Sequence, residues 1–181
     1  MANEAVQNEN EKLVQTYFSY IRDLRTGVAG SIEKLVDLWT LDGTFEFAGA
    51  PPVVGTFHGR AAIQALYKNR FAANKMPLTL EVDAKKPVPE RQAALGVVDT
   101  EVKHIRHRDG HVIAGWTTVI GTADDRGFQV AGSHTFAFKD GKISSLKIFV
   151  SPKAEEARNL RLANLGVEDV GRLALAAWAV V

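Results

Sequence analysis

Cysteine is absent from the 181 residues of this chain, which excludes disulfides, thiol nucleophiles and thiolate metal sites. An excess of one charge is absent as well. The formal net charge is +1, so no overall field attracts nucleic acid or an anionic membrane surface. No apolar run approaches the length of a membrane span, and residues 1–11 are polar and acidic, unlike a secretory signal. We therefore expect a cytoplasmic protein without nucleic-acid or membrane partners.

Several motifs that would indicate a cofactor or a known type of catalysis are also missing. The sequence has no phosphate-binding glycine loop, no Gly-x-Ser-x-Gly elbow and no His-Glu-x-x-His helix. His104, His107 and His111 cluster around an Asp109-Gly110 turn, but a hairpin tip rarely preorganises a closed metal site. The basic stretch 103–108 lacks the interleaved aromatic residues of a nucleic-acid surface. We expect neither a metal nor an organic cofactor.

The first part of the chain shows helical periodicity. Apolar residues recur at three- and four-residue steps over residues 3–24, which predicts an amphipathic helix that ends before Gly27. Ser31 is a candidate N-cap for a second, short helix that carries Leu35, Val36 and Trp39 on one face. Asp42-Gly43 reads as a turn. A third helix is expected from Arg60, and short strands are expected over residues 44–47 and 53–58.

The second part of the chain is rich in strand signals. Alternation predicts strands over residues 78–83, 94–106, 112–122, 128–138 and 142–150. Asp109-Gly110 and Asp140-Gly141 are typical of turns in antiparallel hairpins. Helices followed by a strand meander indicate an α+β fold, with a curved antiparallel sheet covered by three N-terminal helices. We expect one domain over residues 1–152 and a helical extension over residues 153–181, which would form a lid or a dimer contact.

His134 lies within the alternating segment 128–138. Alternation places its side chain on one face with four apolar residues, Phe128, Val130, Phe136 and Phe138. An imidazole changes charge near neutral pH, and burial or a neighbouring group can tune that change. Two interpretations stay open here: a hydrogen-bonded core histidine, or a catalytic acid or base.

Four segments carry a family resemblance: residues 14–17, 38–47, 57–63 and 136–143. With the order of the expected elements, they resemble the cone-shaped fold of the nuclear transport factor 2 superfamily. Within it the chain is most similar to the SnoaL-like group, which includes ketosteroid isomerase, scytalone dehydratase and polyketide cyclases. The resemblance covers residues 10 to 150. It implies the fold but says little about the reaction, because one fold hosts many chemistries and also non-catalytic binders.

The resemblance to ketosteroid isomerase also implies positions for site residues. Tyr17 falls at the oxyanion-hole tyrosine, and His134 falls at the protonated aspartic acid that completes the oxyanion hole. Trp39 and Tyr67 fall at two further tyrosines of a hydrogen-bonded cluster. Phe47 falls at the aspartate general base, and a phenylalanine cannot take a proton. Ketosteroid isomerisation by that mechanism is therefore not expected, although Tyr17 and His134 should both point into the cone.

A tyrosine hydroxyl and an imidazole that converge on an apolar cavity form a minimal acid/base pair. Tyr17 would hydrogen-bond a substrate oxygen, and His134 would take or deliver a proton. We therefore predict a cofactor-independent lyase or isomerase, of dehydratase, retro-aldol or cyclase type, that acts on a small apolar molecule, aromatic or polycyclic. The predicted substrate-binding residues are Trp116, Phe47, Tyr67, Trp39, Thr118, Ile148 and Leu146.

Alternatives remain at this point. The missing base at Phe47 would also suit a non-catalytic small-ligand binding protein of the same fold. An epoxide hydrolase like the limonene-oxide enzyme of the superfamily is disfavoured, because its last-strand aspartate falls near Ile148. Alternation places His104 on the face of Val102, and Glu46 toward solvent unless its strand is bulged. Association as a homodimer through the open sheet face is expected from the resemblance.

Overall fold

The computed structural model describes residues 2–48, 55–73, 96–121 and 128–151. Within them lie three helices, α1 (Ala2–Arg25), α2 (Ser31–Asp37) and α3 (Arg60–Ala73). The strands are β1 (Trp39–Ala48), β2 (Gly55–His58), β3 (Gly96–Arg108), β4 (His111–Gly121), β5 (Phe128–Lys139) and β6 (Lys142–Val150). The strand expected over residues 78–83, the connection between the strands expected over residues 44–47 and 53–58, and the extension over residues 153–181 lie outside the described residues.

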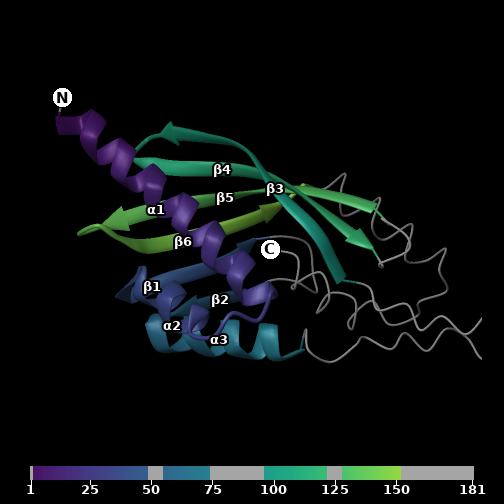
Figure 1. Ribbon diagram of the computed structural model, residues 1–181. Coiled ribbons are helices and arrows are strands. Elements are labelled where there is room, and N and C mark those ends of the chain that lie inside the picture. Colours follow the sequence, from purple (N-terminus) through teal and green to yellow (C-terminus); the bar gives the residue numbers. More distant parts are fainter. Residues whose placement is uncertain (1, 49–54, 74–95, 122–127, 152–181) are drawn as a thin grey trace, which may run out of the picture.

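The six strands form one sheet in the order β2-β1-β6-β5-β4-β3. Figure 1 shows α1 crossing one face of this curved sheet, with α2 and α3 beside β1 and β2. All neighbouring strands are antiparallel except β1 and β6, which are parallel, so the sheet is mixed. The expected α+β cone is confirmed, but its sheet is mixed, whereas a purely antiparallel sheet was expected.

Helix α1 forms where the apolar period predicted it. Val14, Tyr17, Ile21 and Leu24 are buried at three- and four-residue steps, so one stripe of the helix faces the sheet. Glu4 in the first turn and Arg22 in the last turn complement the helix dipole. This is the longest helix in the described part of the chain, and no helix there is both long and apolar enough to cross a bilayer.

The structure corrects three expectations for α2 and the start of β1. Gly30, with a φ of 76°, occupies the N-cap of α2, and the Ser31 hydroxyl instead donates to the carbonyl of Val28 at 2.8 Å. Trp39 begins β1 rather than continuing α2, and it pairs with Ile143. The Asp42-Gly43 pair lies inside β1, where the ladder with β6 is irregular between residues 39 and 44. The position of Trp39 suits either the apolar face of a helix or an inward position in a strand, and its pairing with β6 places it in the strand.

The two predicted hairpin turns are confirmed. Asp109 and Gly110 join β3 to β4 with φ values of 50° and 76°, and Asp140 and Gly141 join β5 to β6 with 52° and 69°. Two consecutive positive φ angles are typical of a type I′ turn, which matches the twist of antiparallel strands. These tight turns fix the register of both hairpins, and through it the residues that meet on the inner face.

Strand β3 does not alternate regularly. Val102 pairs with Trp116 and His104 pairs with Gly115, so Lys103 is an extra residue in the ladder. Such a bulge moves every later side chain to the opposite face. The expectation that His104 shares a face with Val102 is therefore wrong. The exposed His104 ring lies over Gly115 on the outer face, and His107 takes an inner position instead.

Candidate functional site

The register of four strands brings predicted site residues together on the inner face of the sheet. One row of cross-strand neighbours consists of Phe47, Ile148, His134 and Ala114, on β1, β6, β5 and β4. The adjacent row consists of Phe45, Leu146, Phe136 and Val112 on the same strands. All of these side chains are buried. Four residues of the predicted site therefore belong to one continuous apolar surface beneath α1.

His134 is 1% exposed and is enclosed by aromatic rings. Its ring centroid lies 5.1 Å from Phe18, 5.8 Å from Trp116 and 5.9 Å from both Tyr17 and Phe136. The Phe136 ring is stacked on the imidazole, and the Trp116 ring meets it edge-on. Its cross-strand neighbour Ala114 is small, which leaves space for the imidazole. An imidazole in such surroundings is shielded from water, so its charge depends on the groups around it.

Tyr17 and Tyr67 meet through their hydroxyl groups. The two hydroxyl oxygens are 2.8 Å apart, and both side chains are fully buried. One of the two hydroxyl groups donates its hydrogen to the oxygen of the other. Tyr17 comes from α1 and Tyr67 from α3, so the pair joins two helices above the sheet. Tyr67 is therefore a hydrogen-bond partner of Tyr17 as well as a predicted substrate-binding residue.

Trp39 lies apart from the His134 row. It pairs with Ile143 near the start of β6, whereas Phe47 pairs with Ile148 near its end. The backbone oxygen of Trp39 accepts a hydrogen bond from the Arg60 guanidinium, which anchors the start of α3 to β1. Its ring packs on Phe45 with a centroid distance of 6.3 Å. The structure thus places Trp39 at the base of the apolar core and not beside His134.

A polar chain that the sequence did not reveal reaches the inner face from the end of α1. Arg25 Nη1 donates to Thr100 Oγ1 at 2.7 Å, and Thr100 Oγ1 lies 2.6 Å from Thr118 Oγ1. Thr118 is fully buried, and it lies two residues from Trp116 on the same face of β4. The sequence did contain one indication that Arg25 faces the interior, because it follows Ile21 by one helical turn and so lies on the apolar stripe of α1.

The remaining candidates lie elsewhere. Glu46 points outward and pairs with Lys147 at 2.8 Å on the neighbouring strand. His107 Nε2 lies 3.6 Å from Glu11 Oε2 on the inner side, while His111 Nδ1 lies 2.9 Å from the Asp109 carbonyl. The three clustered histidines therefore diverge. No group of three or more histidine, aspartate or glutamate side chains suited to a metal occurs within the described ranges.

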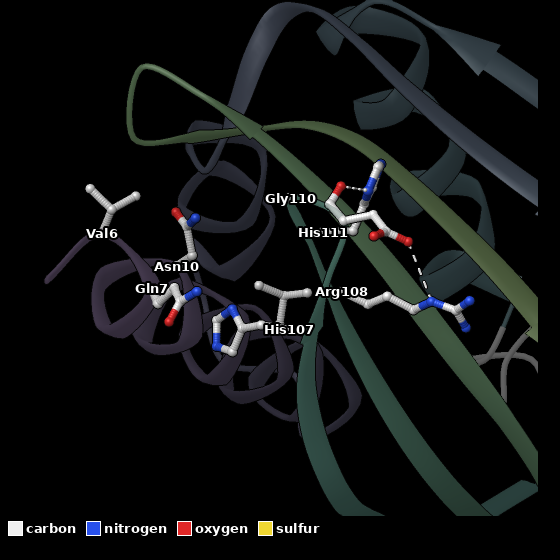
Figure 2. Close-up of a pocket in the computed structure, with 9 residues that line it drawn as sticks. Val6, Gln7, Asn10, His107, Arg108, Gly110 and His111 are labelled. Atoms are coloured by element: carbon white, nitrogen blue, oxygen red, sulfur yellow. Dashed lines mark hydrogen bonds and ion pairs between the residues drawn. The ribbon is translucent and has the colours of Figure 1, made fainter. Parts of the chain in front are cut away.

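A cavity of about 380 Å³ opens between the first turns of α1 and the β3–β4 hairpin. Figure 2 shows Gln7 and Asn10 on α1, the His107 ring extending from β3 toward this helix, and the Arg108 side chain directed away toward Asp109. Its lining residues are Val6, Gln7, Asn10, His107, Arg108, Asp109, Gly110, His111 and Val112. None of the predicted site residues lines this cavity, which lies at the hairpin end of the sheet.

Comparison with known proteins defines the class of this chain. A family model for the SnoaL-like domain matches residues 21–146, which is more than half of the sequence. The chain belongs to the SnoaL-like family. No curated protein matches it, so no relative transfers a specific activity.

Solved structures show the same fold at low identity. A Bacillus subtilis protein provisionally named an isomerase is 17% identical, with a TM-score of 0.54 over 83% of this chain and 95% of its own. A nuclear transport factor 2-like protein from Burkholderia xenovorans LB400 is 16% identical, with a TM-score of 0.53 over 88% and 96%. Bal32a, from a soil-derived mobile gene cassette, is 15% identical, with a TM-score of 0.51 over 81% and 95%. These similarities concern the fold alone.

Proposed function

We propose that this protein is a cofactor-independent lyase or isomerase that acts by proton transfer on a small apolar molecule, aromatic or polycyclic. The observation that supports this most is that two hydrogen-bonded, buried tyrosine hydroxyl groups lie close to a buried imidazole. The Tyr17 ring lies 5.9 Å from the His134 ring and its hydroxyl lies 2.8 Å from that of Tyr67. Aromatic and aliphatic side chains surround these polar groups, as expected for a pocket that binds an apolar substrate.

In this proposal the two polar groups have separate tasks. Tyr17, with its oxygen accepting from Tyr67, donates to a substrate oxygen and stabilises the negative charge that develops there. His134 removes or returns the proton on carbon. Phe47, Ile148 and Trp116 contact the apolar body of the substrate. The resemblance to ketosteroid isomerase puts the buried Phe47 at the position of the general base of that enzyme, and phenylalanine cannot take a proton. In this proposal the buried imidazole of His134 takes the proton instead.

The test follows the one step that dehydration, isomerisation and retro-aldol cleavage of carbonyl compounds share. In D₂O, 2-tetralone exchanges the protons next to its carbonyl group, and proton NMR follows the loss of their signal. The protein should accelerate this exchange. His134→Ala should lower the acceleration by about 10²-fold or more, because a general acid or base contributes about 10²–10⁴-fold. Tyr17→Phe should lower it by about 10-fold or more.

His107→Ala is the matched control, because His107 is a second inner-side imidazole on the same sheet that lies outside the proposed site. Its rate should equal that of the unmodified protein. His134→Gln, which keeps a polar side chain in the same space, serves if the alanine variant does not fold. A folded His134 variant that retains the full rate would refute the assignment.

A second candidate function is a non-catalytic binder of small apolar ligands. Two observations favour it: Phe47 cannot act as a base, and aromatic rings surround His134 on several sides. The same samples distinguish the two functions. Saturable binding of 2-tetralone without any acceleration of exchange would establish the binder and exclude the enzyme.

We also propose that the protein forms a homodimer through the outer face of the sheet. Phe149 is 46% exposed on that face, next to the Lys147–Glu46 pair. Burial of an exposed phenylalanine is a common source of association energy. Sedimentation should give a dimer for the unmodified protein and a shift toward monomer for Phe149→Glu. A monomer at all concentrations, with the circular dichroism of a folded protein, would contradict this.

A further inference from the structure

The Arg25–Thr100–Thr118 chain ends at the buried hydroxyl group of Thr118, which can donate a hydrogen bond. A guanidinium has donors only, so Thr100 Oγ1 accepts the bond from Arg25. A hydroxyl whose oxygen accepts from a charged donor is polarised and donates more strongly. Either hydroxyl can donate across the 2.6 Å contact between the two threonines, and the polarisation by Arg25 favours donation from Thr100 to Thr118. In this direction the hydroxyl hydrogen of Thr118 is available for another acceptor.

A second donor lies on the same face of the same strand. Trp116 is 2% exposed, and its Nε1–H has no hydrogen-bond partner in the described part of the chain. A buried indole N–H normally finds a partner, so an unsatisfied one requires an explanation. Trp116 and Thr118 are two residues apart, a separation of about 7 Å between their Cα atoms in a strand. Both side chains project from the same face of β4, so their two donors can bind one group that has two acceptor oxygens.

We propose that Trp116 Nε1–H and the Thr118 hydroxyl bind a carboxylate group of the substrate or ligand, with Arg25 positioning Thr118 through Thr100. This inference rests on the proposed function, in which the interior of the cone binds a small apolar molecule. It adds the substrate class, an aromatic or polycyclic carboxylic acid. Trp116 and Thr118 are then specificity-determining residues, and Arg25 is a positioning residue.

The charges of the interior suit an anion. The buried polar side chains among the described residues are Ser31, Thr118 and His134, and none of them is acidic. The nearest formal charge along the hydrogen-bond chain is the Arg25 guanidinium, which is positive. Hydrogen bonds to a charged group contribute more than neutral ones, and removal of one donor leaves the anion partly unsatisfied. A carboxylate is therefore favoured over a neutral group of the same shape.

Two probes of matched shape test this class, 2-naphthoate and 2-methylnaphthalene. Calorimetry or NMR titration of the unmodified protein should give tighter binding of 2-naphthoate by about 10- to 100-fold, the effect of one or two charged hydrogen bonds. Thr118→Val removes the hydroxyl and keeps the shape, so most of this preference should disappear. Thr118→Ser keeps the hydroxyl and should keep the preference. Trp116→Phe should also reduce it, and Arg25→Gln should reduce it without abolishing binding of the neutral probe.

The chemical shifts of the indole N–H signals distinguish a ligand-binding role of Trp116 from a purely structural one. The Trp116 signal, assigned with the Trp116→Phe variant, should shift downfield with 2-naphthoate and not with 2-methylnaphthalene. Trp39 is the internal control, because its Nε1 is also buried without a partner in the described region but lies at the start of β1. The Trp39 signal should respond equally to both probes.

The outcomes separate this inference from the proposed function. Equal affinities for the two probes, or a Thr118→Val variant with an unchanged preference, overturn the carboxylate site while the apolar pocket stands. A clear preference for 2-naphthoate in a protein that does not accelerate 2-tetralone exchange supports the carboxylate site and overturns catalysis. Failure of both probes to bind overturns the inference together with the pocket on which it rests.

Discussion

Gly132 has no side chain at the point where the Trp116 indole crosses β5. The two residues are cross-strand partners, and a Cβ atom at residue 132 would lie 2.4 Å from Trp116 Cζ2 and 2.4 Å from the Phe149 backbone oxygen. Real Cβ atoms essentially never approach another heavy atom below 3.0 Å. A Gly132→Ala substitution therefore requires a movement of about 0.6 Å in a strand backbone that other residues hold in place.

The expected cost follows from two opposing effects. Forced overpacking of a well-packed interior costs about 1–3 kcal/mol. Alanine also restricts the unfolded chain, which stabilises the variant by about 0.5–1 kcal/mol. We expect a net loss of about 1–2 kcal/mol in the free energy of unfolding. The Trp116 indole should also shift, since the new methyl group contacts its ring.

Gly115→Ala is the matched control on the neighbouring strand. Its new Cβ atom would meet the His104 ring at 2.3 Å, but this ring is the end of an exposed side chain and can rotate away. We expect a change within about 0.5 kcal/mol. Urea unfolding followed by circular dichroism measures both variants. An unchanged unfolding midpoint for Gly132→Ala, or equal losses of stability for the two substitutions, would contradict this prediction.

Three further predictions concern single contacts. Tyr17→Phe and Tyr67→Phe should each lower the free energy of unfolding by about 1–3 kcal/mol, because each substitution leaves the other buried hydroxyl without this bond. The double variant should lose less than the sum of the two single losses, and additive losses would exclude the hydrogen bond. The Thr40 hydroxyl, the Asp42 backbone amide and the Lys139 ammonium group lower the pKa of the Asp42 carboxyl from 3.8. The ionised carboxylate therefore stabilises the folded protein above pH 3.8, and this contribution is lost as the pH falls through the lowered pKa. Asp42→Asn should reduce stability at about pH 6, and this loss should become smaller as the pH falls below 3.8; a loss that does not change with pH would contradict this. The partly exposed His107–Glu11 pair should contribute less than about 1 kcal/mol in a double-mutant cycle, and a larger coupling would show that it is shielded from water.

Local patterns predicted much of the fold correctly. The apolar period of α1 and the two Asp-Gly turns depend on residues that are neighbours in sequence, so they could be identified without knowledge of the tertiary structure. Trp39 could not be placed in this way, because its spacing from Val36 suits a helix and its position also suits a strand. The bulge at Lys103 was equally hidden, since it exists only relative to the partner strand β4.

The candidate site shows the same division. Strand alternation identified His134 as an imidazole in an apolar row, and the resemblance to the family selected Tyr17. The resemblance also implied a hydrogen-bonded cluster with Tyr67, and the structure shows the bond between Tyr17 and Tyr67. Neither signal could indicate that Arg25 reaches Thr100. The apolar stripe of α1 did contain Arg25, but a charged residue at a helix end is usually solvated.

Short-range periodicity and turn chemistry specify the helices, the hairpins and the inward face of β5, so these features could be predicted from neighbouring residues. Which side chains meet in the interior depends on the tertiary structure. The Tyr17–Tyr67 pair and the Arg25–Thr100–Thr118 chain join residues 50 and 75 positions apart, and their contact depends on strand register, one bulge and the position of α1 over the sheet. Those features result from packing between distant segments, which no local pattern encodes.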